Sequence, residues 1–463
     1  MRKFVIFLIL LIFSTGLSFA QEVIEPEQPQ VDACVDQTSP SALQMQISAN
    51  IPSVNKITLE EAIDLALKNN IDMRKTRLDI DKAKNDIKTA NRLQNPYYQS
   101  FNNFGTAGLD NPNENGLIIP IEIAKRSARK RLAKSELELT KGNTALAEFY
   151  LKMEVRDAYI ELVASKSILK ILEDQKALLE DLLNIAQKKY EVGAVPQMEV
   201  IQAKMALGQI MTQLNTAKTA VEIAKYSFNK TLNIKDNSIL YDTTEDYLPD
   251  KKGFERLLTP APHSDLPDFE EISYIALNKR LDIQNAQKEV DVAQKNLTVV
   301  MRKRVPDIEI GGGLLSISSS MSTLDRSAKG GYVAGNITNI PLLYRYEPEI
   351  KNAKIEVEQS ELKYDSVKNK AMQDLHSSYD KFLTAQNNLN YYNDALLAES
   401  NKFLGMSHKS YMIGKTNITD YIFIQQSYKN IVMGYVNALS EYYSSWVEFL
   451  RDVNDEDINL NEK

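Results

Sequence analysis

The feature that most constrains this chain is one helical pattern that runs through residues 123–191. Its apolar residues recur three, four or seven positions apart, which is the spacing of helices that pack side by side in a coiled coil. Two runs show this spacing: Leu146, Phe149, Met153, Ile160 and Val163, and then Leu172, Leu179, Leu182, Ala186 and Tyr190. The pattern predicts a single helix of about 104 Å.

The residues after this pattern predict a reversal of the chain. Gly193 stands where a helix C-cap requires a positive φ, and Pro196 stands where the first turn of a helix tolerates a missing N–H. We therefore expect a returning helix over residues 196–232. Its length of about 55 Å is half that of the long helix.

The first residues have the features of a secretory signal. Arg2 and Lys3 precede the apolar run 4–13, and Ser18-Phe19-Ala20 is a small-residue cleavage site. We expect residues 1–20 to be a signal peptide that is cut after Ala20. No later segment offers 18 continuous apolar residues, so a membrane-spanning part would have to consist of β-strands closed into a barrel.

Composition excludes several classes of protein. Without the signal peptide the chain keeps 53 basic and 62 acidic residues, a net charge of −9, which argues against a nucleic-acid partner. Its 17 glycines are few for 463 residues, which favours long helices over a compact enzyme core.

Cys34 is the only cysteine, so it forms no internal disulfide. We interpret it as an unpaired thiol in an extended arm, residues 21–56, that is rich in proline.

A helix is expected to follow this arm. Thr58 and Glu61 have the spacing of a capping box, and the Asn95-Pro96 pair forbids continuation beyond residue 95. The same segment recurs 210 positions later, from Asp268 to Pro306. The identical residues of the first copy are Glu60, Glu61, Ala66, Leu67, Asp72, Asp81, Ala83, Arg92 and Pro96, which match Glu270, Glu271, Ala276, Leu277, Asp282, Asp291, Ala293, Arg302 and Pro306.

The repeat continues through the long helix, with an offset of 221. Pro120 matches Pro341, and the turn residues match in the same way. We therefore expect two long helices of equal length, the second ending at Met412. In each copy two half-length helices, stacked end to end, match one long helix; in the second copy these are residues 269–305 and 416–452. The weakest point is Gly142-Asn143 inside the first long helix, because glycine costs about 1 kcal/mol there.

The segments that join the helices alternate apolar and polar residues, which indicates strands. We expect strands near residues 97–107, 116–121, 307–318 and 331–341, with residues 110–113 as the first turn. Each pair is long enough to cross a bilayer as a hairpin. The alternative is a soluble hairpin that packs on the helices.

These elements predict the domain organisation. Residues 57–233 form the first helix-hairpin-helix repeat, 234–267 an equatorial connector, 268–453 the second repeat and 454–463 an acidic tail. One chain supplies four strands, whereas the smallest membrane barrels have about eight. The predicted fold is mainly α: a long antiparallel α-helical coiled-coil barrel, with four β-strands per chain that complete a β-barrel together with the strands of other chains.

In the order and spacing of these residues the chain resembles the duplicated unit of TolC-type outer membrane efflux proteins, from residue 57 to about residue 452. The resemblance implies a homotrimer whose β-barrel spans the outer membrane lipid and whose helical tunnel crosses the periplasm. It also implies docking to a periplasmic adaptor, the membrane fusion protein, and to an inner-membrane pump. The implied function is the exit duct of a tripartite efflux or type I secretion system. Residues 120–126 further resemble the branch that serves heavy-metal cation efflux.

The resemblance also implies which residues form the periplasmic tips. Tyr190 and Gly193 mark one tip, and Tyr411 and Gly414 mark the other. The best-known family member closes its tip with an arginine and two aspartates, at positions that hold Thr416, Asp420 and Phe423 here.

Asp420 is the one of these residues that is retained, so it is the candidate gate. We expect its partner to be Lys409 or Lys415. In the alternative interpretation Asp420 simply caps the returning helix.

No pattern of residues indicates catalysis or a cofactor. His263, His376 and His408 lie far apart and lack helical partners four residues away, so they predict no metal site. The chain has no glycine-rich phosphate loop, nucleophile elbow or CxxC pair. We expect that the protein is not an enzyme. The competing hypothesis is a soluble periplasmic coiled-coil adaptor or scaffold.

Overall fold

The computed structural model describes residues 53–102, 111–234, 239–248, 254–257, 259, 268–321, 324–392 and 394–454. All of them belong to one compact unit, Pro52–Lys463. The predicted signal peptide, Cys34 and nearly all of the acidic tail lie outside the described residues, so these predictions stand untested.

Helices dominate the described structure, which confirms the predicted fold class. The first repeat holds α2 (Leu59–Asn69), α3 (Ile71–Ala90), α4 (Lys125–Glu191) and α5 (Gln197–Thr231). The second holds α6 (Phe269–Lys279), α7 (Leu281–Arg302), α8 (Glu347–Tyr391), α9 (Asp394–Met412) and α10 (Ile418–Val453). No helix among the described residues combines the length and apolar character that a membrane crossing requires.

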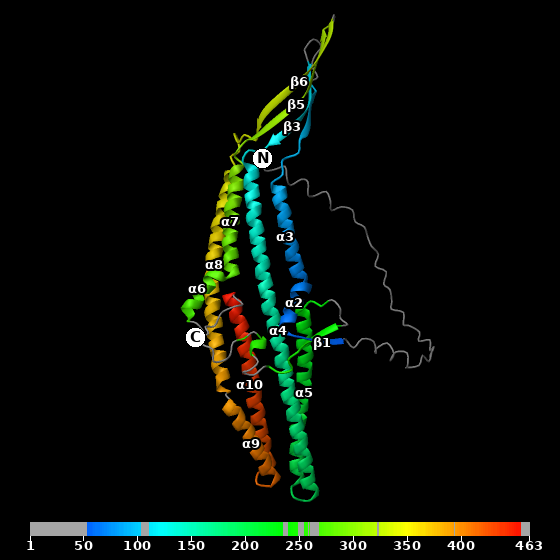
Figure 1. Cartoon of the computed structure of the whole chain (residues 1–463), viewed down its shortest axis with the longest axis vertical. Helices are drawn as coiled ribbons and strands as arrows, with labels where there is room; N and C mark the ends of the chain where they lie inside the picture. Colours follow the sequence, from blue (N-terminus) through cyan, green and yellow to red (C-terminus); the bar gives the residue numbers. More distant parts are fainter. Residues whose placement is uncertain are drawn as a thin grey trace, which may run out of the picture. The chain divides into compact units, whose positions relative to one another are not determined.

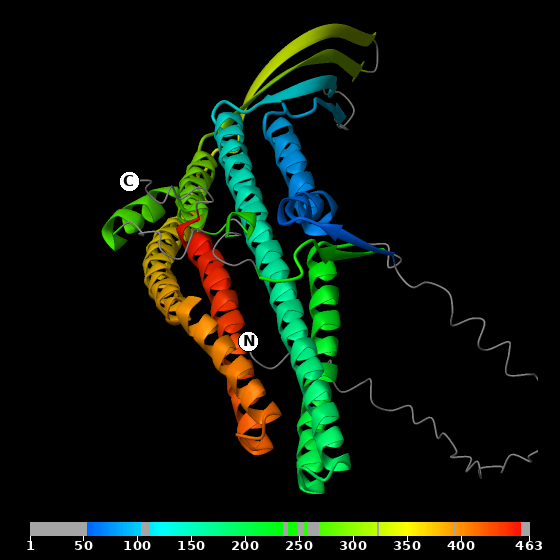
Figure 2. The same cartoon turned by 60° about the horizontal axis from the view of Figure 1, so that its bottom comes forward.

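Helix α4 is the 67-residue element along which the others pack. Figures 1 and 2 show α3 beside one half of α4 and α5 beside the other half, and α2, α7 and α10 contact α4 as well. The buried stripe of α4 runs from Ala128 to Ala186, as the coiled-coil spacing predicts. Two half-length helices therefore do flank one long helix.

Each predicted half-length helix that begins a repeat is broken in two, which the sequence pattern did not reveal. The breaks fall at Asn70 and Arg280, where ψ is 124° and 120°, and the positions are equivalent in the two repeats. The Asn70 side chain accepts a hydrogen bond from the Met73 N–H at 3.0 Å and so starts α3. Arg280 is buried and donates to the Asp452 carbonyl at 2.6 Å. Different side chains thus hold the same bend.

The second long helix was expected to match the first in length and to end at Met412, and the span Glu347–Met412 confirms this, but the prediction of a continuous helix was wrong. It is interrupted after Tyr391, so α8 and α9 replace one continuous helix. At the break the Tyr392 hydroxyl lies over Gly434 of α10, so close that a β-carbon there would be 2.4 Å from it. If the helix continued through residue 392 without a break, the Tyr392 ring would not lie over Gly434.

Gly142, the expected weak point of α4, is helical and has a packing role. A β-carbon at this position would lie 2.0 Å from Oδ1 of Asn285 on α7. The absence of a side chain lets α7 approach, and the Asn285 amide then donates to Oδ1 of Asn143 at 3.1 Å. Closer packing between the repeats offsets the unfavourable helix propensity.

Four strands form one antiparallel sheet in the order β2-β3-β5-β6. They are β2 (Tyr97–Asn102), β3 (Asn111–Ile121), β5 (Asp307–Met321) and β6 (Leu324–Thr338). The two predicted hairpins are joined directly, because β3 also pairs with β5. The placement of Asn111–Asn113 in a turn was wrong, because these residues begin β3 and pair with Ser316–Ser318.

One face of this sheet is apolar and exposed. Val333 pairs with Gly312, which pairs in turn with Leu117, and the same register aligns the other members. We call this set the apolar sheet face: Leu117, Ile119, Ile310, Leu314, Val333 and Ile337, which are 58%, 48%, 48%, 73%, 88% and 64% exposed.

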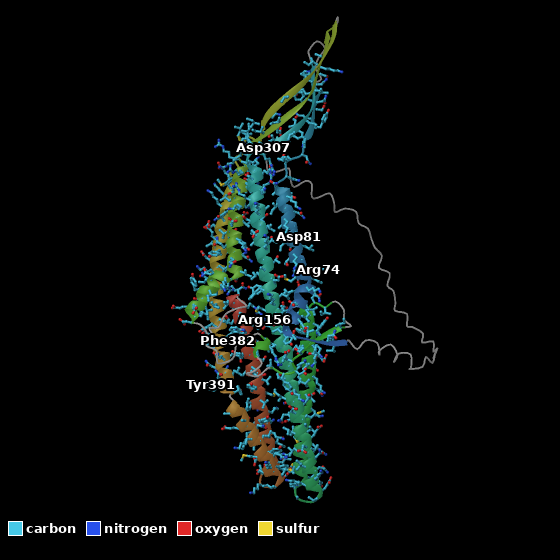
Figure 3. All side chains as sticks on the ribbon, viewed as in Figure 1. Arg74, Asp81, Arg156, Asp307, Phe382 and Tyr391 are labelled. Atoms are coloured by element: carbon cyan, nitrogen blue, oxygen red, sulfur yellow. The ribbon has the colours of Figure 1, made fainter. Side chains whose placement is uncertain are left out.

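An ion pair stands where the sheet meets the helices. Asp307, the first residue of β5, is buried and accepts from Lys125 Nζ at 2.6 Å and from the Asn339 amide at 2.8 Å. Lys125 begins α4, so this contact joins the long helix of one repeat to the first strand of the other. Figure 3 shows Asp307 at this junction.

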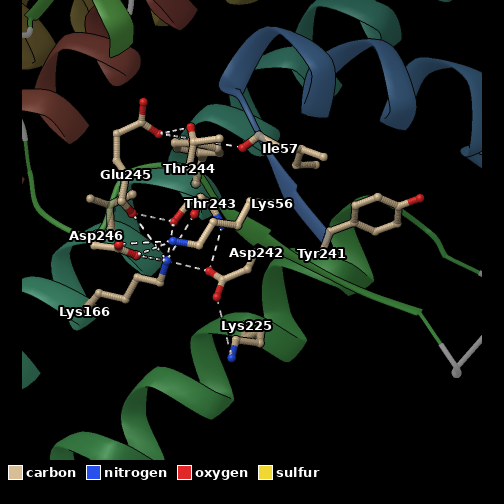
Figure 4. Close-up of polar contacts among 12 residues, drawn as sticks. Lys56, Ile57, Lys166, Lys225, Tyr241, Asp242, Thr243, Thr244, Glu245 and Asp246 are labelled. Atoms are coloured by element: carbon tan, nitrogen blue, oxygen red, sulfur yellow. Dashed lines mark hydrogen bonds and ion pairs between the residues drawn. The ribbon is translucent and has the colours of Figure 1, made fainter. Parts of the chain in front are cut away.

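The connector contains more structure than the predicted irregular chain. Its strand β4 (Ile239–Thr243) pairs in parallel with β1 (Ser53–Ile57), and a short 3₁₀ helix, η1, spans Phe254–Leu257. Lys166 of α4 forms ion pairs with Asp242 at 2.6 Å and with Asp246 at 3.2 Å (Figure 4). Lys56 also pairs with Asp246, at 3.0 Å. This polar cluster fixes the small sheet against α4.

The described apolar core has two parts. The larger part gathers aromatic side chains of α8 and α10, such as Phe382, Tyr442 and Trp446, and also includes Tyr159 of α4, whose ring contacts Phe228 of α5. The smaller part lies between α4, α5, α9 and α10 and ends near Tyr411 and Tyr421.

The close approach of β3 to β5 requires glycine at position 313. A β-carbon there would lie 2.1 Å from the Asn115 carbonyl oxygen and 2.5 Å from the Gly116 Cα, so Gly313→Ala must separate β3 from β5. At Gly335 of β6 a β-carbon meets nothing within 4 Å. We expect Gly313→Ala to cost about 1–3 kcal/mol and to lower the temperature at which the folded form is lost in heat-modifiable gel migration. Gly335→Ala is the control and should migrate like the parent, and equal behaviour of the two variants would contradict the register.

Candidate functional site: the turns of the two helical hairpins

The first turn, here called the first tip, comprises residues 189–199 between α4 and α5. Gly193 has φ +72° and donates its N–H to the Tyr190 carbonyl at 2.9 Å. The Ala194 N–H reaches back to the Lys189 carbonyl at 2.8 Å. A side chain at position 193 would be strained at this φ, so the sequence requires glycine here.

The second tip, residues 408–421, repeats this geometry between α9 and α10. Gly414 has φ +75° and donates to the Tyr411 carbonyl at 3.1 Å, and Lys415 donates to the Ser410 carbonyl at 2.9 Å. Asn417 is the N-cap of α10 and accepts from the Asp420 N–H at 2.8 Å. The two predicted glycine turns therefore have matching hydrogen bonds at the offset of 221.

The tips are tied to one another through Tyr411. Its hydroxyl donates to Oε2 of Glu199 on α5 at 3.1 Å, and its carbonyl accepts from Lys189 Nζ of α4. The same ammonium lies 4.2 Å from the centre of the Tyr411 ring, within cation–π range. Burial, and then the negative charge of Glu199, raise the pKa of Tyr411, so the hydroxyl keeps the proton that it donates.

Tyr411 is also packed against Tyr421 of α10. The two rings stack 5.6 Å apart at an angle of 8°, and the Tyr421 hydroxyl is 2.9 Å from Nδ1 of His408. Both tyrosines are 2% exposed. The second tip therefore has a buried aromatic centre that is held by groups from the first.

Tyr190, the equivalent residue of the first repeat, is 40% exposed. The two repeats therefore have the same residue type at this position, but the tyrosine is exposed in the first repeat and buried in the second. Nothing in the sequence separates these two tyrosines, because both precede a glycine by three positions.

Asp420 lies in the first turn of α10 and is exposed. Among the described residues, no ion pair joins its carboxylate to Lys409 or to Lys415. The cap of α10 is Asn417, so Asp420 is not the cap residue of the alternative interpretation. Its negative charge still favours the helix through the dipole.

Lys189 and Glu199 are the site residues that sequence reasoning missed. Glu199 sits in the first turn of α5, where an acidic residue needs no other explanation, and Lys189 sits in the last turn of α4, where the same holds for a basic residue. Only the approach of the two hairpins reveals their shared contact with Tyr411.

Exposed apolar side chains surround both glycine turns. Val192 and Met198 are 79% and 62% exposed beside Gly193, and Met412 and Ile413 are 48% and 68% exposed beside Gly414. Within the described residues, no group of three or more histidine, cysteine or acidic side chains is placed to hold a metal ion.

The sequence matches a known family in two segments. The family described as outer membrane efflux protein matches residues 62–233 and 272–450, which are the two repeats. A curated relative, the fusaric acid resistance protein FusA of Burkholderia cepacia, is 22% identical over 247 residues. That match covers 52% of this chain and 42% of FusA, so the chain spans less than half of that protein's length.

Solved structures share the fold at low identity. A membrane protein from Pseudomonas aeruginosa has a TM-score of 0.67 at 16% identity, with 88% of this chain and 96% of that chain covered. The MtrE outer membrane channel of Neisseria gonorrhoeae, in its open state, has a TM-score of 0.62 at 15% identity, with 94% and 98% covered. The two matched repeats comprise well over half of the sequence, and the chain belongs to the outer membrane efflux protein family.

Proposed function

We propose that this chain is one subunit of an outer membrane exit duct, through which a tripartite efflux or type I secretion system releases its substrate passively. The family supports the efflux role. The duct would conduct its substrate and catalyse no reaction.

The observation that carries this proposal is the apolar sheet face. Its six side chains are all between 48% and 88% exposed in one chain, and they form a contiguous apolar surface on paired strands. Exposure of such an apolar surface to water is unfavourable, whereas its contact with lipid tails is favourable. A soluble adaptor or scaffold would have to cover this face with its own helices, and α3, α4, α7 and α8 leave it exposed.

The sheet also supports an assembly of several copies, and the family supports three. Four strands are half of the smallest number known to close around an axis in a membrane, so one chain needs partners. Three copies would give twelve strands. The periplasmic helices of the three copies would then surround a common tunnel.

Neighbouring leucines of β5 test the membrane assignment. Leu314 belongs to the apolar sheet face, and Leu315 points to the opposite face. We expect Leu314→Lys to cost about 2–4 kcal/mol per subunit near the middle of the bilayer and to reduce the trimer recovered from outer membranes. Leu315→Lys should assemble at near-parent levels. Equal recovery of both variants, or a parent protein found in the periplasmic extract, would contradict the proposal.

We propose that the two tips dock the periplasmic adaptor, which in turn engages an inner-membrane pump. Support comes from the exposed apolar residues beside Gly193 and Gly414, because such residues favour association with another protein. Tyr190 would join this surface, while Tyr411 would hold it together.

The pump would select the substrate. The resistance protein FusA supports export of a toxic small molecule, and the heavy-metal branch remains a prediction from residues 120–126.

The contact between Tyr411 and Glu199 would keep the tips closed. A hydrogen bond to a charged acceptor contributes about 1.5–3 kcal/mol, so Tyr411→Phe should increase the conductance of purified trimers in planar bilayers. Tyr190→Phe is the matched control, because its exposed hydroxyl lies in the equivalent position of the other repeat. Unchanged conductance of Tyr411→Phe would remove this contact from the gate.

Asp420 remains the candidate gate residue of the sequence, and we propose that its carboxylate acts in the assembled trimer rather than within one chain. Asp420→Ala should then increase conductance in bilayers, with only a small fall in the thermal midpoint of the trimer from the lost interaction with the dipole of α10. Asp420→Glu keeps the charge and should conduct like the parent. If both substitutions leave conductance unchanged, Asp420 has no role in gating.

A further inference from the structure

A buried lysine lies between the two hairpins, away from the tips. Lys429 of α10 is 7% exposed, and its Nζ donates to Oε1 of Gln213 on α5 at 3.2 Å. Within the described part of the chain no carboxylate lies within ion-pair distance of it. Burial lowers the pKa of Lys429, since no opposite charge offsets the loss of hydration. This lysine is unlike Lys166, which is partly buried and has two aspartate partners.

Lys429 lines a small cavity at the junction of α4, α5 and α10. The cavity has a volume of about 30 Å³, where one water needs about 10–15 Å³. It therefore holds one small ion or about two waters. No carboxylate lines it, and its polar lining consists of Gln175, Gln209, Gln213, Gln425, Gln426 and Lys429.

Gln425 is an unpartnered polar side chain at this cavity. It is 2% exposed, and neither its amide nitrogen nor its amide oxygen has a hydrogen-bond partner of standard geometry within the described residues, although the Tyr421 hydroxyl one turn earlier is close enough for a weak contact. It lies four residues before Lys429 on α10, so both side chains share one face of the helix. A buried amide without a partner costs free energy, which a bound group in the cavity would recover.

The lining selects the charge of such a group. An ammonium repels a cation, and the glutamine amides add N–H donors without adding negative charge. A buried ammonium is stable only when it is neutralised by a partner or loses its proton. A small anion would supply the missing charge and accept hydrogen bonds from Lys429 and Gln425. Gln209, Gln213 and Gln426 are exposed, so the cavity opens to solvent, and its small inner volume favours a monatomic anion.

We propose that this cavity binds a small monovalent inorganic anion of the size of chloride or bromide. The anion neutralises Lys429 and joins α10 of the second repeat to α4 and α5 of the first. The site would clamp the two hairpins above the tips. It rests on contacts within one chain, so it stands whether or not the proposed duct function is correct.

Thermal unfolding of the purified full chain in detergent tests the site. We expect the midpoint to rise by roughly 2 °C or more when sodium chloride or bromide replaces sodium gluconate at equal ionic strength. Lys429→Met should abolish this difference and be at least as stable as the parent in gluconate, because it removes an unpaired buried charge. Lys363→Met is the control, since Lys363 is 58% exposed in its side chain and pairs with Glu289. It should keep the chloride response.

Bromide gives a direct readout that does not depend on stability. An anomalous diffraction peak within hydrogen-bond distance of Lys429 Nζ, absent from Lys429→Met crystals, would support the site. If Lys429→Met fails to fold, Gln425→Leu should weaken the chloride response instead. A parent protein with equal midpoints in chloride and gluconate, or bromide crystals with only water in the cavity, would overturn the proposal.

Discussion

The burial of one apolar stripe along α4 is the interaction on which the rest of this structure depends. The stripe runs from Ala128 to Ala186, and each buried methylene contributes about 0.8 kcal/mol. No shorter helix can cover a stripe of this length alone. Several helices therefore cover the stripe together. Helices α2 and α3 lie along one part of α4 and α5 lies along another, while α7 and α10 of the second repeat also contact α4.

Duplication explains the common plan of the two halves, and packing explains their differences. Asn70 and Arg280 break equivalent helices with almost the same ψ, but one caps the next helix and the other is a buried cation held by the Asp282 carboxylate and by two backbone carbonyls. Tyr190 and Tyr411 end equivalent helices, and only Tyr411 is buried. The two repeats pack against each other, so equivalent residues meet different neighbours.

Buried charges mark the places where helices from the two repeats, or a helix and a sheet, must hold one another. Lys125 pairs with Asp307 where α4 meets β5, and Lys166 pairs with Asp242 where α4 meets the small sheet. Asp307 and Asp242 are buried and the two lysines are partly buried, and each ammonium group has a carboxylate partner, as burial of a charge requires. Lys429 lies in a comparable position between hairpins and lacks one. In the site that we propose, a bound anion takes the place of the carboxylate that pairs with each of the other two lysines.

The sequence by itself determined the repeat, the coiled-coil spacing, the two glycine turns and the alternation of the strands, because each follows from local backbone preferences and from the period of buried residues. It could not reveal that β3 pairs with β5, that Tyr392 interrupts the second long helix beside Gly434, or that Lys189 and Glu199 meet Tyr411. These features join residues from different elements. Only the tertiary structure decides them, because their energies depend on which side chains become neighbours.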